Sequence, residues 1–185
     1  VADGSTSASI LRKLRPSPVS AADRAEAVLQ IPQESVLKPT AREQKQLDSL
    51  ETVLRYHERE QIFAVTLIDV PMATAKLHGR AFVLISRPTL QLLSVPELQA
   101  TVAHEMGHEY FWDEYAPLLQ QNDTHGLQTL ELKCDGVAAL TLVALGVDAS
   151  HLYRAIEKIG RFNGVPRARW GNNGYPHPRD RERFI

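Results

Sequence analysis

The chain has 185 residues, of which 43% are hydrophobic, and a formal net charge of -1. This length suits one compact domain, and the near-neutral charge gives no basic field that would attract nucleic acid, so we expect no nucleic-acid partner. The longest nearly uninterrupted apolar stretch, residues 136–147 (GVAALTLVALGV), is too short for a membrane-spanning helix, which needs roughly 20 residues; we therefore expect no integral membrane segment.

The cellular location is only weakly indicated. Cys134 is the single cysteine, which rules out an intramolecular disulfide but leaves the redox compartment undecided. The sequence starts at Val1 and not at a methionine, as it would if a signal peptide had been removed or if the chain had been shortened at its N-terminus. We expect an exported protein, periplasmic or secreted, with the cytoplasm as the alternative.

Residues 1–38 are expected to form an N-terminal tail with one short helix. Residues 1–20 are rich in Ser, Ala and Pro, a composition that buries little surface. The segment SAADRAEAVLQ favours a short helix, with Ser20 as its N-cap and Pro32 as its stop.

Residues 39–185 are expected to form the folded domain. It should begin with an amphipathic helix over residues 40–59, whose apolar face carries Leu47, Leu50 and Leu54. The β-branched and aromatic segments 61–70 (QIFAVTLIDV) and 80–86 (RAFVLIS) predict strands. The glycine in the intervening LHGR suits a hairpin turn.

The rest of the domain is predicted to be mainly helical. A helix from Pro96 follows Ser94 and has Glu97 in its first turn, as helix starts often do. Two more are expected over residues 127–145 and 149–159, each followed by a glycine. The residues after them are rich in turn formers. Together these elements predict an α+β fold.

The helix from Pro96 contains the motif HEMGH. His104 and His108 are four residues apart, so both imidazoles can bind the same ion from one face of the helix. Glu105 lies to the side, where its carboxylate can reach a water at the metal without being a ligand. This is the H-E-x-x-H pattern of zinc metalloproteases.

A catalytic zinc usually has three protein ligands. One class of metalloprotease continues the motif to a glycine and a third histidine, but Phe111 and Glu114 occupy those positions here. In another class of metalloprotease the third ligand is a glutamate on a later helix. Here Glu131 and Asp135 lie four residues apart on one face of the helix expected over residues 127–145. Glu131 would complete the ligand set, and Asp135 would accept the N–H of a ligating histidine. A solvated acidic helix face is the alternative for these two residues.

Three segments resemble the zinc metallopeptidase family that includes the CAAX prenyl proteases and the heat-shock protease HtpX. They are AFVLISRPTLQLLSVPELQATVAHEMGH (residues 81–108), ELKCD (131–135) and HPRDRER (177–183), in the family's order. The resemblance implies a zincin-like gluzincin fold, in which a small mixed β-sheet packs on the active-site helix. It also implies that His177 and Arg183 approach the metal and help to stabilise the oxyanion. The alternative for His177 is a fourth zinc ligand that closes the site and makes the enzyme latent.

The motifs and the resemblance together predict a zinc-dependent endopeptidase, a soluble and minimal member of this family. We expect about one zinc per chain, with Glu105 as general base. The substrate would be a peptide or an unfolded protein. It would pair with an exposed strand formed by Met72, Ala73, Thr74, Ala75 and Lys76.

Two other functions stay open at this stage. The domain could be a chaperone-like or protein-interaction module with weak or latent proteolysis, although Glu105 argues against a purely structural zinc. It could also hydrolyse an amide that is not a peptide. Cleavage of peptide libraries would separate these alternatives.

Overall fold

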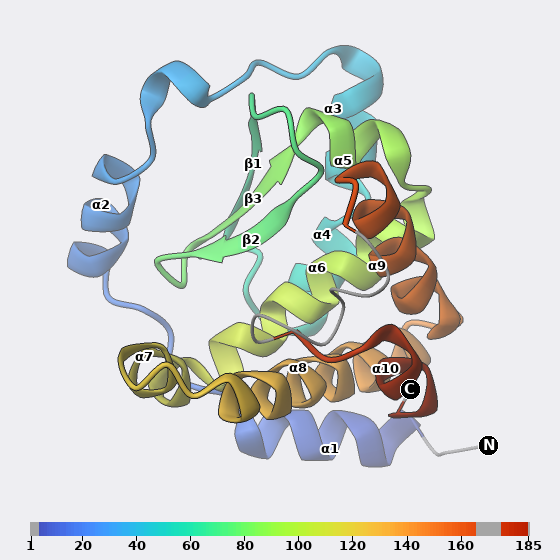
Figure 1. The fold of residues 1–185 in the computed structure, drawn as a ribbon. Helices are drawn as coiled ribbons and strands as arrows, with labels where there is room; N and C mark the ends of the chain where they lie inside the picture. The colour runs from blue at the N-terminus through green and yellow to red at the C-terminus, as the bar shows by residue number, and fades with distance from the viewer. Residues whose placement is uncertain (1–3, 166–174, 185) are drawn as a thin grey trace.

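A three-stranded sheet lies between helices in the computed structural model, which describes residues 4–165 and 175–184 (Figure 1). The helices are α1 (Gly4–Leu14), α2 (Ala21–Leu29), α3 (Ala41–Asp48), α4 (Glu51–Tyr56), α5 (Arg87–Leu92), α6 (Val95–Tyr110), α7 (Trp112–Gln120), α8 (Thr124–Ala144), α9 (Ser150–Phe162) and α10 (Pro178–Phe184), with a short 3-10 turn at Gln33–Ser35. The strands are β1 (Ala64–Ile68), β2 (Ala75–His78) and β3 (Phe82–Ser86). The α+β class predicted from the sequence is confirmed.

The sheet is mixed and has the order β1-β3-β2. β1 is parallel to β3, and β2 is antiparallel to it. The predicted hairpin turn joins β2 to β3 at Gly79 and Arg80, which both have positive φ angles, as tight hairpin turns require. Among residues 4–165 and 175–184, β2 is therefore an edge strand, whose outer side is not paired with another strand.

β3 is buried on both faces, which explains its unbroken apolar sequence. Phe82 and Leu84 pack with Ala27 in one cluster, whereas Val83 and Ile85 belong to the main core. This alternation follows from the two-residue period of a strand. The sheet thus forms a layer with α2 on one side and α6 on the other (Figure 1).

The helix expected over residues 40–59 is in fact two helices, α3 and α4. Its start is as predicted, because Thr40 and Glu43 form a capping box. The break lies at Ser49, whose hydroxyl donates to the Gln46 carbonyl at 2.6 Å. Such local side-chain bonds compete with the helical pattern, and this one was not evident from the periodicity.

The N-terminal segment is not the loose tail that its composition suggests. Leu11 of α1 is buried, and α1 packs along α8 (Figure 1). Arginine side chains hold the connection between α1 and α2: Arg59 donates to the Pro16 carbonyl and Arg80 to the Ser17 carbonyl, both at 2.6 Å. Residues 4–38 therefore belong to the packed structure, because a few well-placed apolar residues and these bonds anchor them.

No helix in the described part of the chain is both long enough and apolar enough to cross a membrane.

His57 is buried between two hydroxyl groups. Its Nδ1 lies 2.9 Å from the Tyr110 hydroxyl, and its Nε2 lies 3.0 Å from the Thr141 hydroxyl. Burial, together with the charges of Arg15 and Arg59, lowers the pKa of His57 to about 3. The neutral imidazole thus links α4 to α6 and α8.

We expect His57 to make the protein sensitive to acid. The unfolded chain has the ordinary histidine pKa of about 6.5, so it takes up a proton first as the pH falls. The stabilisation is complete above this pKa and is lost progressively towards the folded pKa of about 3. At about 1.4 kcal/mol per pKa unit, the loss from this group between pH 6.5 and 5 is about 2 kcal/mol.

Urea unfolding of the wild-type protein and of His57→Gln at a series of pH values measures this loss. The variant has no imidazole to protonate and should lose less stability over the same range. Equal losses in the two proteins would show that His57 is not the source.

Candidate metal centre

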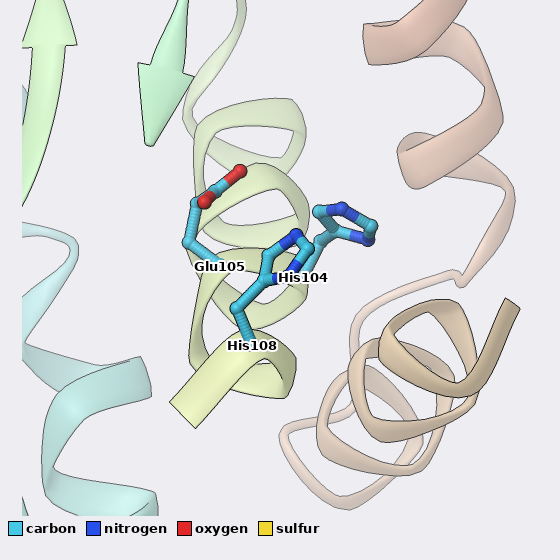
Figure 2. Close-up of side chains that lie close together, drawn as sticks. All are labelled: His104, Glu105 and His108. Carbon is cyan, nitrogen blue, oxygen red and sulfur yellow. The ribbon is translucent and has the colours of Figure 1, made fainter. Parts of the chain in front are cut away.

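Helix α6 presents three potential metal ligands from neighbouring turns. The imidazoles of His104 and His108 lie close together on one side of the helix, and the Glu105 carboxylate lies beside them, on the side of the sheet (Figure 2). One ligand atom from each side chain lies within 4.8 Å of the other two. His104 and Glu105 are buried, and His108 is half-buried. This cluster could hold a metal ion.

Side-chain interactions fix the first turn of α6. They therefore help to set the orientation of the helix and of the site residues on its later turns. Glu97 accepts a hydrogen bond from the Ser94 backbone N–H at 2.8 Å and completes the capping box. Lys158 of α9 pairs with the same carboxylate at 2.8 Å. The predicted helix start is therefore present, and it is attached to α9.

Helix α8 brings the two predicted carboxylates to this cluster. Glu131 Oε2 lies 3.3 Å from His104 Nε2, and Glu131 Oε1 lies 3.5 Å from His108 Nε2. On the other side of the same ring, His104 Nδ1 lies 2.8 Å from Asp135 Oδ1. The structure thus places His104, His108, Glu131 and Asp135 together, as the sequence predicted.

Gly107 allows α6 and α8 to approach this closely. A Cβ atom at Gly107 would lie 2.6 Å from the Cα and 2.8 Å from the Cβ of Cys134. Cys134 itself is buried, and burial raises the pKa of its thiol. The glycine in HEMGH therefore has a packing role between the two helices that carry the site.

We expect Gly107→Ala to destabilise the protein by about 1–3 kcal/mol, the usual cost of overpacking a core. It should also weaken metal binding, because the helices must separate by a few tenths of an ångström or more. Urea unfolding and a metal titration would measure the two effects.

Gly136→Ala on α8 is the matched control. A Cβ atom there would meet Phe184 at 3.4 Å, an ordinary contact. Alanine also favours a helix over glycine. Gly136→Ala should therefore preserve or increase stability. Equal destabilisation by both substitutions would contradict the role given to Gly107.

The arginine at the site is Arg181, and the expectation for Arg183 is wrong. Arg181 Nε donates to Asp135 Oδ2 at 2.7 Å, and its Nη2 donates to Glu131 Oε2 at 2.8 Å. Arg183 is exposed. Both lie on α10, where residues two apart point in nearly opposite directions, so only one of them can face α8.

His177 lies outside a helix, just before α10. Its carbonyl accepts hydrogen bonds from the backbone N–H groups of Asp180 and Arg181, in the first turn of α10. Its side chain is half-buried, and it is not among the described residues that line the cavity. Pro176, its neighbour, does line it. The structure thus places His177 at the border of the site.

The buried charges at the site are strongly coupled. Burial disfavours the charge of Glu131, but its bonds with His104 and the nearby Arg181 prevail and lower its pKa. Burial also disfavours a charged His104, but Asp135 and Glu131 prevail and raise its pKa. Burial and the charge of His104 lower the pKa of His108 to about 4. A metal ion that binds these imidazoles must therefore displace a proton from His104.

Glu105 connects the cluster to the edge strand. Its Oε2 accepts a hydrogen bond from the backbone N–H of Leu77 at 2.8 Å. Burial raises the pKa of Glu105 to about 7, in spite of the opposing effects of His104 and of this bond. Glu105 is thus a buried acid that can gain or lose a proton near neutral pH.

The cluster forms part of the wall of a cavity of about 690 Å³. All five residues predicted to form the substrate-binding strand, residues 72–76, line this cavity, but only Ala75 and Lys76 lie in strand β2, so the predicted strand bounds are wrong. Leu152, Ile156 and Ile159 of α9 add an apolar wall that the sequence analysis did not identify. Trp112 also lines the cavity and is half-buried.

Comparison of the chain with models of protein families and with curated proteins finds no match.

Proposed function

We propose that the protein is a zinc-dependent endopeptidase of the gluzincin type, with zinc held by His104, His108 and Glu131. One observation carries the proposal: Glu105, a buried acid, lies beside this ligand set in the wall of a cavity. A structural zinc site has no use for such a base, because its coordination shell is closed.

The distances support zinc as the ion. Two ligands of a tetrahedral zinc with bonds of about 2.1 Å lie about 3.4 Å apart. The two separations between Glu131 and the imidazoles, 3.3 and 3.5 Å, are close to this value. Asp135 accepts the Nδ1–H of His104, as ligating histidines commonly require.

Glu131 is a better third ligand than Glu105. Both oxygens of Glu131 face the two imidazoles. Glu105 instead directs one oxygen to the Leu77 N–H. This assignment leaves the Glu105 carboxylate available for proton transfer.

When bound, zinc would supply a Lewis acid that acidifies water and polarises a carbonyl group. Glu105 would accept a proton from the attacking water and then deliver it to the amine nitrogen that leaves. We retain His177, at the border of the cavity, as the proposed donor to the oxygen that gains charge. Arg183 has no such role in this proposal, because it is exposed.

The outer edge of β2 would align the substrate. The main chain of a peptide can pair with an edge strand, while alternate side chains enter neighbouring pockets. Here the apolar wall of Leu152, Ile156 and Ile159 faces the same cavity. We therefore expect substrates that are extended and carry a large apolar side chain near the cut, as unfolded proteins do.

The test is incubation of the zinc-loaded protein with unfolded proteins and peptide libraries, followed by mass spectrometry of the products. We expect internal cleavage that stops on addition of a chelator and returns on addition of zinc. Stoichiometric zinc without cleavage of any of these substrates would contradict the proposal. The protein would then be a zinc-binding interaction module.

A further inference from the structure

Asn163 makes the contacts of a neighbouring strand with a single side chain. Its Oδ1 accepts a hydrogen bond from the backbone N–H of Ala73, and its Nδ2 donates to the Ala73 carbonyl, both at 2.8 Å. These are the two bonds that a paired residue of an antiparallel strand would make. Asn163 and Ala73 both line the cavity.

The backbone at Asn163 is set by the end of α9. Asn163 is the C-cap residue of α9, and the next residue, Gly164, has a φ of 65°. The N–H of Gly164 donates to Arg161, and the N–H of Val165 donates to Gly160, the bonds of a Schellman motif. The amide is thus presented to Ala73 by a fixed helix end.

Ala73 is the first of three alternate residues whose backbone groups face the cavity side. Thr74 faces the other way, because its carbonyl accepts from the Ser86 N–H at 2.9 Å and its N–H donates to the Ser86 hydroxyl at 3.0 Å. Ladder bonds alternate along an antiparallel pair, so the backbone groups of Ala75 and Leu77 turn away from β3. The bond from Leu77 to Glu105 agrees with this direction.

We propose that Asn163 is a specificity-determining residue: it limits the part of the strand edge that can pair with a substrate peptide, so that pairing stops at Ala75. The inference rests on the proposed binding of peptides to this edge. Because Asn163 already engages both backbone groups of Ala73, a bound peptide pairs with Ala75 and then has to leave the edge. Ala73 and Leu77 are four residues apart, about 13 Å, so the paired stretch on this side of Glu105 is short.

The test uses peptide binding, which does not require cleavage. Fluorescence anisotropy would give the affinity of Glu105→Gln, and of Glu105→Gln with Asn163→Ala, for two series of labelled peptides. Both series start from the same apolar core peptide. One series extends this peptide at its N-terminus, and the other extends it at its C-terminus. With Asn163 present, affinity should stop rising once the peptide reaches Ala75. With Asn163→Ala, one series should gain a further roughly 2- to 10-fold per added hydrogen bond.

Two further variants separate this role from a structural one. Asn163→Asp can accept from the Ala73 N–H but cannot donate to its carbonyl, so the gain should be smaller. Arg161→Ala, an exposed position on the last turn of α9, should keep the wild-type length dependence. A general loosening of the segment would lower the affinity for all lengths alike.

Identical length dependence with and without Asn163 would overturn the proposal, and so would the failure of every peptide to bind. Peptides that bind with the expected length dependence, but are never cut by the zinc-loaded wild-type protein, would contradict the proposed proteolysis and leave the role of Asn163 supported.

Discussion

Arg181→Met is expected to lower the free energy of unfolding by about 3–5 kcal/mol, the usual cost of removing one partner from buried ion pairs. Arg181 is 4% exposed and pairs with Glu131 and Asp135, which are 7% and 0% exposed. Methionine fills a similar volume but leaves both carboxylates without the guanidinium. Urea unfolding at neutral pH in the presence of a chelator would measure the loss.

Arg183→Met provides the control on the same helix. Arg183 is exposed, so this substitution should change stability by less than about 0.5 kcal/mol. Zinc should restore part of the stability of Arg181→Met, because the ion would compensate the charge of Glu131. Equal losses at the two positions would show that the ion pairs of Arg181 contribute little.

Glu105→Gln is expected to reduce the hydrolysis of a good substrate by at least about 100-fold, the low end for loss of a general base. Glutamine has nearly the same shape and can still accept the Leu77 N–H, so folding and zinc content should persist. The measurement is kcat/KM for one cleaved peptide, with zinc analysis of the same samples.

Glu114→Gln is a suitable control, because Glu114 is exposed and pairs with Lys133 on the surface. It should retain the wild-type rate. Unchanged turnover in Glu105→Gln would refute the base assignment. Loss of zinc in that variant would show that Glu105 is a ligand instead.

The parts of the site that depend on local periodicity could be predicted from the sequence. Helical spacing alone places His104 next to His108 and Glu131 next to Asp135. The hairpin and the start of α6 also follow from short-range signals, a glycine turn and a capping box. These features are set by residues within a few positions of each other.

The other parts depend on contacts between distant segments. The choice of Arg181 over Arg183 follows from where α10 begins, and the turn-rich composition before it did not reveal that helix. Asn163 reaches a backbone 90 residues away, which leaves no local pattern. The N-terminal segment packs through isolated residues such as Leu11 and Ala27, too few to predict burial from composition.

The most direct test of the central claim is the zinc content of the purified protein after gel filtration, for the wild type and for His104→Ala/His108→Ala/Glu131→Ala. Three converging ligands with Asp135 behind them should give about one zinc per chain in the wild type and none in the triple variant. The triple variant should also release no protons when zinc is added. Stoichiometric zinc in the triple variant would contradict the proposed ligand set.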